Sequence, residues 1–198
     1  MQTTPFVTVP LLSPEVCDVL TDSILLKRAV QDIEPVVGAE TGSTIVPGSC
    51  WGLWGDSTTD SLLPRFLPTM EERTGKKLVP SYSYARIYYP GSSLLRHRDR
   101  PSCEHSITLN LSGSPWLLHI GGIPVLTHKG WGCIYDGVNY EHWRDPLQSK
   151  EPVVQAFFHY VEDVEENASR FYDGRPSLGL PAKFTTYYDE THGKPAKP

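Results

Sequence analysis

Apolar residues recur at two different spacings in this chain, and the change falls near residue 79. Before that point, Val16, Leu20 and Ile24 recur at the spacing of one helix face. The preceding Ser13-Pro14-Glu15 supplies a capping hydroxyl, a proline for the first turn and an acid at the positive end of the helix dipole. The pattern predicts a helix over about 14–29.

A second helix is predicted over about 61–75, with Gly75 as its C-terminal stop. Pro64 and Pro68 should bend this helix or shift its start. Between the two helices, residues 31–60 are rich in Gly, Ser and Thr, and we expect a loop or an outlying hairpin there. The apolar face of the second helix consists of Leu63, Phe66, Leu67 and Met70.

After residue 79, apolar and polar residues alternate in short runs separated by turns such as Pro90-Gly91 and Gly121-Gly122. Eight short strands in about 80 residues predict a mainly β fold with flanking helices, built as a jelly roll or a small barrel. The expected strands are Ser83–Tyr89, Leu94–Asp99, His105–Leu111, Trp116–Ile120, Ile123–Thr127, Gly132–Tyr135, Tyr140–Arg144 and Val153–Val161.

The length of 198 residues favours a single domain. We divide it into an N-terminal helical region, 1–78, a jelly-roll core, 79–162, and a C-terminal tail, 163–198. The middle of the tail should pack on the body, and about six residues at its end should be loose. The aromatic residues behind the first of these expectations are Phe171, Tyr172, Phe184, Tyr187 and Tyr188.

Composition narrows the classes of function. Eighteen prolines and sixteen glycines fit the many turns, and a net charge of −5 disfavours binding along a nucleic-acid backbone. No apolar run approaches the roughly 20 residues of a membrane span, and the first five residues lack the parts of a secretion signal. The four cysteines stand far apart with no CxxC pair, so we expect free thiols in a reducing compartment, the cytoplasm.

The most informative motif is His97-Arg98-Asp99 in the second expected strand. Residues i and i+2 of a strand point to the same face, so His97 and Asp99 can meet at one metal ion. His142 is the best candidate for a third ligand, because the intervening hairpins can return the chain beside the first strand. Two imidazoles and one carboxylate leave positions open, which suits Fe(II) that binds a chelating co-substrate and then O2.

At these residues the chain resembles the 2-oxoglutarate- and Fe(II)-dependent oxygenases, and most closely their prolyl-4-hydroxylase-like branch. The resemblance rests on the Tyr-x-Pro-Gly turn Tyr88-Tyr89-Pro90-Gly91, the His-x-Asp pair, a glycine-rich β region and a lone histidine before a terminal strand. The segment Leu12–Cys17 also resembles the opening helix of that branch, and the resemblance covers about 11–161.

This resemblance implies a double-stranded β-helix with helices packed outside it. It implies that His97, Asp99 and His142 bind Fe(II), with 2-oxoglutarate and O2 as co-substrates. The reaction that it implies hydroxylates a C–H bond and releases CO2 and succinate.

One expected feature is missing. The basic residue that holds the far carboxylate of 2-oxoglutarate in this family would fall near Val153, which is not basic. Arg144 is our first choice of anchor, because it shares a strand face with His142 and can form a bidentate pair with a carboxylate. Lys150 is the second choice and Arg86 the third.

Three further residues are candidates for contacts with the co-substrate. In the resembled branch a tyrosine near Tyr88 and Tyr89 donates a hydrogen bond to 2-oxoglutarate, and only one of two consecutive strand residues can face inward. Asn110 could add a polar contact from the third strand, or serve a turn. Trp143 points away from His142, and we expect it beneath a helix.

Alternation places Arg96, Arg98 and Arg100 opposite the ligands, as a solvated charged edge. If the strand ends by Arg100, that residue could instead reach the rim and bind an anionic substrate. We expect a structural role for Cys103. We expect no ligand role for the histidines that have no matching acid two residues away on a metal-binding strand, which are His119, His128, His159 and His192.

The leading expectation for the substrate is a protein or peptide side chain, with proline as one candidate, or a free amino acid. Oxidative demethylation of nucleic-acid bases is a second reading, which the acidic balance and the absence of a basic, aromatic lid disfavour. A cupin-like metalloprotein that does not use 2-oxoglutarate is the third, because the late basic residue is missing.

Overall fold

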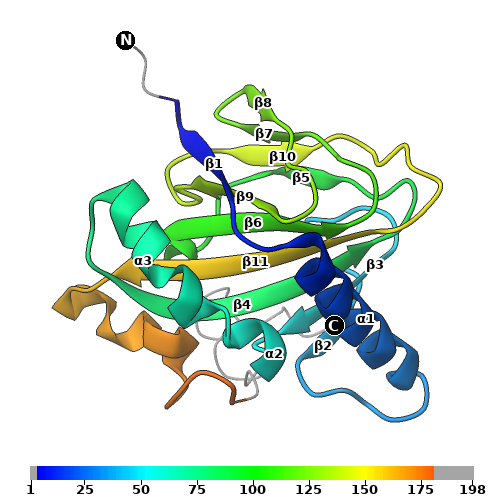
Figure 1. The fold of residues 1–198 in the computed structure, drawn as a ribbon, viewed down its shortest axis with the longest axis horizontal. Helices are drawn as coiled ribbons and strands as arrows, with labels where there is room; N and C mark the ends of the chain where they lie inside the picture. Colours follow the sequence, from blue (N-terminus) through cyan, green and yellow to red (C-terminus); the bar gives the residue numbers. More distant parts are fainter. Residues whose placement is uncertain (1–3, 181–198) are drawn as a thin grey trace, which may run out of the picture.

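The computed structural model describes residues 4–180, and its strands form two antiparallel sheets (Figure 1). In spatial order, the larger sheet consists of β1 (Phe6–Pro10), β9 (Trp131–Tyr135), β6 (His105–Ser112), β11 (Val153–Glu162), β4 (Leu78–Tyr88), β3 (Cys50–Trp54) and β2 (Ala39–Thr41). The smaller sheet consists of β5 (Leu94–His97), β10 (His142–Arg144), β7 (Leu118–Ile120) and β8 (Ile123–Val125). This arrangement is the jelly roll that the strand count predicted and the double-stranded β-helix that the resemblance implied.

Helices cover the outer face of the larger sheet. Figure 1 shows α1 (Pro14–Val30) and α3 (Leu63–Thr74) in front of β4, β11 and β6. Both predicted helices are therefore confirmed, and the first begins as expected, with the Ser13 hydroxyl accepting a hydrogen bond from the Val16 N–H. The second is preceded by a separate short turn of helix, α2 (Ser57–Asp60), and ends at Gly75 with a φ of 70°.

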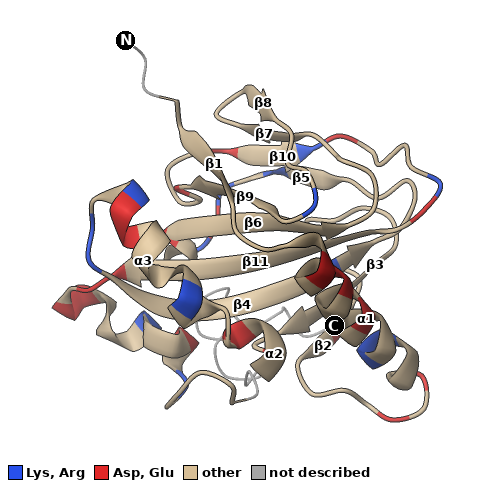
Figure 2. Cartoon of the chain, viewed as in Figure 1, with Lys and Arg blue, Asp and Glu red and all other residues tan. Residues whose placement is uncertain are grey.

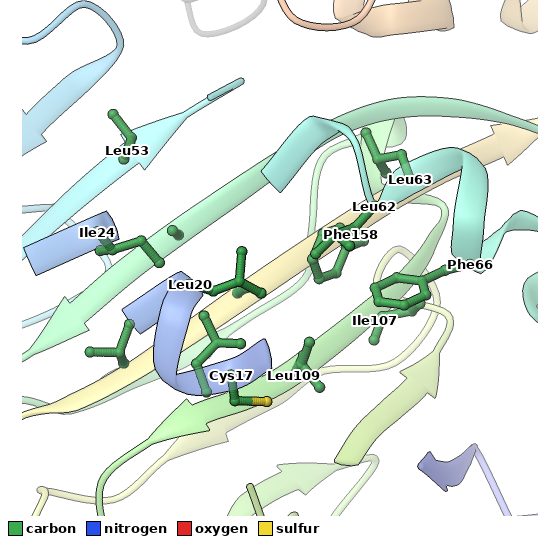
Figure 3. Packing of buried hydrophobic residues seen from close by; sticks show 14 of the residues in the cluster. Cys17, Leu20, Ile24, Leu53, Leu62, Leu63, Phe66, Ile107, Leu109 and Phe158 are labelled. Atoms are coloured by element: carbon green, nitrogen blue, oxygen red, sulfur yellow. The ribbon is translucent and has the colours of Figure 1, made fainter. Parts of the chain in front are cut away.

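The main hydrophobic core lies between these helices and the larger sheet (Figure 3). The Phe66 ring of α3 meets the Phe158 ring of β11 edge to face, with 5.0 Å between centroids. Burial of such aromatic and aliphatic side chains is the dominant stabilising contribution in a domain of this size. From α1 the core receives Cys17, Leu20 and Ile24, and from the sheet it receives Leu53, Ile107 and Leu109.

All eight expected strands are present, several of them shorter than predicted. The largest difference in the other direction is in β4, which begins at Leu78 and not at Ser83. Pro80 lies inside it, opposite a register shift between His159 and Tyr160 of β11, and such irregularities tolerate a residue without an N–H group.

Three strands were not predicted. The segment 31–60 contains a hairpin of β2 and β3, but this hairpin is not outlying, because β3 pairs with β4 from Cys50↔Tyr88 to Trp54↔Tyr84. The strand β1 pairs with β9 at the opposite edge of the larger sheet. The region before residue 79 therefore contributes strands as well as helices to the fold.

The described part of the C-terminal tail packs on the body, as expected. It contains two stretches of 3₁₀ helix merged as η2 (Glu165–Gly174), and Arg175 after it forms an ion pair of 2.8 Å with the buried Asp60. The expectations for Phe184, Tyr187, Tyr188 and the chain end lie outside the described residues. Within residues 4–180, no helix has the length and apolar character needed to cross a bilayer.

Candidate metal centre and its cavity

The two sheets together place the three candidate ligands in one cluster. His97 is the last residue of β5, Asp99 follows two residues later, and His142 is the first residue of β10. His97 and His142 are paired across the two strands, which explains how residues 45 positions apart meet. The Nε2 atoms of His97 and His142 lie 3.4 and 3.5 Å from Oδ1 of Asp99.

The Nδ1 atoms of both imidazole rings already have hydrogen-bond partners. Nδ1 of His97 lies 2.7 Å from the Leu95 carbonyl oxygen, and Nδ1 of His142 lies 3.1 Å from that of Tyr140. A carbonyl only accepts, so each Nδ1 carries a proton, and Nε2 is the atom that can give a lone pair to a metal ion. Two lone pairs and a carboxylate oxygen then converge on one point, an arrangement that fits a divalent cation.

The protein alone already favours the charged carboxylate. Burial by itself would raise the pKa of Asp99, but the hydrogen bonds with His142 and His97 outweigh burial and hold this pKa well below its usual range. Burial would likewise lower the pKa of His142, and the neighbouring Asp99 raises it instead. Without a metal ion the pair therefore favours a charged Asp99 beside a protonated His142, and a cation that binds there takes the place of that proton.

Asp99 is fixed by the turn that follows β9. Its N–H donates to the Gly137 carbonyl over 2.9 Å, and its carboxylate lies directly against Gly137. A Cβ atom added at Gly137 would stand 2.2 Å from Oδ2 of Asp99, so any side chain there would displace the carboxylate. Oδ2 is buried and has no hydrogen-bond partner among the described residues.

The cluster opens into a cavity of about 1060 Å³ between the two sheets. A cavity of this size is at the upper end of the range for small-molecule sites. Its lining includes Glu40, Trp54, Tyr82, Tyr84, Arg86, Tyr88, Arg98, Arg100, Cys103, Tyr135, Arg144, Phe157 and His159, besides the three candidate ligands.

Arg144, the first choice for the co-substrate anchor, lines this cavity and is only 2% exposed. Its Nη1 donates to the Trp116 carbonyl, whereas its buried Nε and Nη2 have no partner among the described residues. Burial lowers the pKa of Arg144, and no carboxylate of the described residues pairs with it. A buried guanidinium with unsatisfied donors is strongly unfavourable unless an anion joins it, so this residue fits the carboxylate of a bound acid.

The two consecutive tyrosines face opposite sides of β4. Tyr88 lines the cavity, with a buried hydroxyl that has no partner among the described residues, and its ring meets Trp116 edge to face at 5.1 Å. Tyr89 instead packs against the main hydrophobic core on the helix side. Of the two candidates, only Tyr88 is placed for a contact inside the cavity.

The other anchor candidates are placed less favourably. Lys150 is exposed in the connection before β11 and does not line the cavity. Arg86 does line it, but its guanidinium already pairs with Glu40 at 3.3 Å and donates to the Tyr84 hydroxyl. Asn110 donates to the Thr127 carbonyl and does not line the cavity.

The strand that carries His97 ends there, so strict alternation does not continue to Arg100. Arg98 and Arg100 both line the cavity, and the expectation of a charged edge opposite the ligands holds only for Arg96. Arg96 lies over the Trp143 ring at 3.9 Å, and Trp143 also stacks on His119. Trp143 is therefore covered by these side chains and not by a helix.

Sequence reasoning missed His159, which lines the cavity from β11. Its Nδ1 lies 2.8 Å from the Ser106 hydroxyl oxygen, which itself donates to the Cys103 carbonyl. Nδ1 therefore donates, and Nε2 is an acceptor near Asp99 and the Cys103 sulfur. Only the alternation of Phe157 and His159 on the last strand could have indicated that both face inward.

Comparison with solved structures identifies proteins that share this fold. No family model and no curated protein matches the sequence. Among solved structures, a Pseudomonas putida prolyl-4-hydroxylase superposes with a TM-score of 0.60 at 13% identity, covering 82% of this chain and 95% of that one. AviO1 from Streptomyces viridochromogenes Tue57 superposes with a TM-score of 0.65 at 13% identity, covering 81% of this chain and 90% of that one.

HygX from Streptomyces hygroscopicus, solved with nickel, 2-oxoglutarate and hygromycin B bound, gives a TM-score of 0.61 at 11% identity and covers 81% of this chain and 84% of that one. Identities this low establish a shared architecture and nothing finer. The chain has the double-stranded β-helix fold of the 2-oxoglutarate- and Fe(II)-dependent oxygenases, so the resemblance seen in the sequence is confirmed at the level of the fold.

Proposed function

We propose that this protein is an Fe(II)- and 2-oxoglutarate-dependent dioxygenase that hydroxylates a C–H bond. One observation carries the proposal: a cluster of two histidines and one aspartate shares a cavity with a buried arginine that has no anionic partner among the described residues. The cluster provides the ligands for the metal, and the arginine provides the counter-charge for an acid that reaches toward it.

We propose a role for each group. His97, Asp99 and His142 hold Fe(II) on one side and leave its other side open to the cavity. Arg144 lies two residues beyond His142, about 6.6 Å along a strand, which is close to the span of a five-carbon dicarboxylate. Arg144 binds the far carboxylate of 2-oxoglutarate, and the Tyr88 hydroxyl donates a further hydrogen bond to the co-substrate.

Bound iron supplies the activation of O2 that couples oxidation of the co-substrate to oxidation of the substrate. In balance, substrate C–H, 2-oxoglutarate and O2 give substrate C–OH, succinate and CO2. The protein's own contribution is to orient both organic molecules and to exclude water from the cavity. The aromatic side chains between the sheets provide that exclusion.

For the substrate, we propose a side chain of a protein or peptide, with proline as one candidate, or a free amino acid. The similarity to a Pseudomonas putida prolyl-4-hydroxylase and to a viral collagen prolyl hydroxylase supports this class. The net charge of −5 disfavours nucleic acid. We also propose a reducing compartment, the cytoplasm, since all four cysteines are free and buried.

The test is anaerobic titration of the Fe(II)-loaded protein with 2-oxoglutarate. We expect a weak visible charge-transfer band as the co-substrate chelates the iron, and succinate formation once O2 is admitted. Arg144→Gln should raise the 2-oxoglutarate concentration needed for half of the band at least tenfold while iron stays bound. Lys150→Gln, which removes an exposed cation outside the cavity, is the matched control and should change nothing.

Two results would replace the proposal. Bound iron without any band or any succinate would favour a cupin-like metalloprotein that does not use 2-oxoglutarate. Release of formaldehyde from methylated DNA, with no product 16 Da heavier from peptides or amino acids, would favour base demethylation.

A further inference from the structure

The charge of the cavity is opposite to that of the chain. The protein carries a net −5, yet four arginines and only two acidic residues line the space between the sheets. The acidic residues are Glu40 and the metal-facing Asp99, and the arginines are Arg86, Arg98, Arg100 and Arg144. A basic cavity in an acidic protein concentrates anions at that place.

Two of these arginines are neutralised by carboxylates of the protein. Arg86 pairs with Glu40 at 3.3 Å. Arg100 forms a two-pronged pair with Asp173 of the C-terminal tail, at 2.9 and 3.0 Å. These two cations are therefore parts of the cavity wall.

The other two, Arg144 and Arg98, have no carboxylate partner among the described residues. The proposed function assigns 2-oxoglutarate to Arg144. Arg98 remains, an exposed residue between His97 and Asp99 that lines both the large cavity and a neighbouring pocket of about 270 Å³. A cation at the rim, next in sequence to two ligands of the iron, can hold a substrate beside the reacting centre.

An aromatic wall faces the same space from the larger sheet. The rings of Trp54 and Tyr82 are stacked, with centroids 4.3 Å apart and an angle of 6° between planes. Tyr84 meets Trp54 edge to face at 5.6 Å and lies 6.0 Å from Phe157. We define Trp54, Tyr82, Tyr84 and Phe157 as the aromatic wall; such a surface binds flat apolar groups.

We propose that the substrate is a small organic anion whose acid group binds Arg98 and whose ring or other flat apolar body lies on the aromatic wall. The inference rests on the proposed function, because it leaves Arg144 to the co-substrate. The cavity of about 1060 Å³ has room for the five-carbon co-substrate and a ring-sized molecule together. A substrate acid group at Arg98 narrows the substrate class to molecules that carry such a group, of which an amino acid is one example.

The experiment uses a charged probe and its neutral isostere. Binding of 3-phenylpropanoate and of 3-phenylpropanamide to the anaerobic Fe(II) protein is measured by calorimetry, with and without saturating 2-oxoglutarate. We expect the acid to bind at least tenfold more tightly than the amide, with or without 2-oxoglutarate. In Arg98→Gln this ratio should fall close to one, and in Arg98→Lys it should be partly retained.

Two control variants locate the effect. Arg96→Gln removes a neighbouring cation that lies over Trp143 and near Glu141, outside the large cavity, and should leave the ratio unchanged. At saturating 2-oxoglutarate, Arg144→Gln should leave the ratio unchanged as well, because the co-substrate then occupies that part of the cavity. Trp54→Ala should weaken the acid and the amide by the same factor, because both place the phenyl ring on the wall.

The proposal is overturned if acid and amide bind equally, if neither binds, if the ratio survives Arg98→Gln, or if it is lost in Arg144→Gln at saturating 2-oxoglutarate. None of these outcomes depends on turnover, so the band and succinate test of the proposed function stands or fails separately. A retained acid preference at Arg98 without any 2-oxoglutarate band would support the anion site and overturn the oxygenase assignment.

Discussion

The two sheets contribute differently to the cavity that lies between them. In the larger sheet, β11 pairs with β4 along ten residues, and the helices bury its outer face. In the smaller sheet, β10 has three residues and pairs with β5 at only two positions with an irregular register. Both candidate metal-binding histidines nevertheless belong to the smaller sheet.

The two sheets also differ in where their charged residues lie. In Figure 2, β6 and β11 are free of charged residues along most of their length, whereas blue and red segments gather around β5 and β10. Long regular pairing over an apolar core supplies stability, and short strand ends place polar groups where regular pairing stops. The comparison teaches that metal binding and folding stability should be separable by mutation.

The largest effect is expected at the metal. Asp99→Ala should abolish Fe(II) binding and succinate formation, because only two ligands remain. Without Asp99, burial favours the neutral form of His142, so the free energy of unfolding of the metal-free protein should change by only about 1 kcal/mol. Iron analysis and urea denaturation test both parts, with the 75% exposed Asp145→Ala as control. Iron retained at wild-type affinity would contradict the ligand assignment.

The next effect should appear in stability and not in metal binding. Phe158→Ala removes a fully buried ring that packs on Phe66, which should cost about 3–5 kcal/mol of unfolding free energy in urea. The folded fraction should still bind Fe(II). Leu26→Ala, at an exposed position of α1, is the control and should cost little. If Phe158→Ala loses iron but keeps its stability, the separation between the sheets is wrong.

Two cavity histidines, one from each sheet, should give opposite pH dependence in the metal-free protein. Burial lowers the pKa of His159 from 6.5 to about 4, so between those values the unfolded chain binds a proton that the folded chain does not. The neutral His159 therefore contributes fully to the free energy of unfolding above pH 6.5. This contribution, about 3 kcal/mol, is lost as the pH falls toward 4.

For His142, burial is outweighed by Asp99 and the pKa is raised, so its contribution is present at low pH and lost as pH rises through the folded pKa. Urea denaturation of wild type, His159→Gln and His142→Gln between pH 4 and 8 measures both signs. The His159 variant should flatten the loss at low pH. If the unfolding free energy of His159→Gln falls at low pH as steeply as that of the wild type, His159 is protonated in the folded protein.

The smallest effect should come from Gly137. Its φ is outside the left-handed region, so alanine adds no backbone strain there, but its methyl group would collide with the Asp99 carboxylate. Gly137→Ala should weaken Fe(II) binding by about 10- to 100-fold with little change in stability. Asn139→Ala, in the same turn and exposed, should bind iron normally. Equal iron affinity in both variants would mean that Asp99 has other room to move.

The strands and helices that carry a clear local pattern were predictable. The helix over 14–29, the stop at Gly75 and all eight strands of the core follow from spacing and turn residues. The strands β1, β2 and β3 were missed because they are short and have no strong alternation, and they become strands by pairing with β9 and β4.

The same distinction applies to the site. The sequence by itself determined that His97, Asp99 and His142 could share one place, because strand alternation and the return of a hairpin depend on near neighbours. It also indicated Arg144, because that residue shares the strand of His142.

Only the tertiary structure decided which charges are satisfied. Arg100 finds Asp173 across 73 residues, and Arg86 finds Glu40 across 46. Arg144 and Arg98 find no carboxylate among the described residues, and β5 ends early enough to turn Arg98 toward the cavity. Ion pairs between distant segments depend on how the whole chain packs, so no local pattern distinguishes an arginine of the wall from one that awaits a ligand.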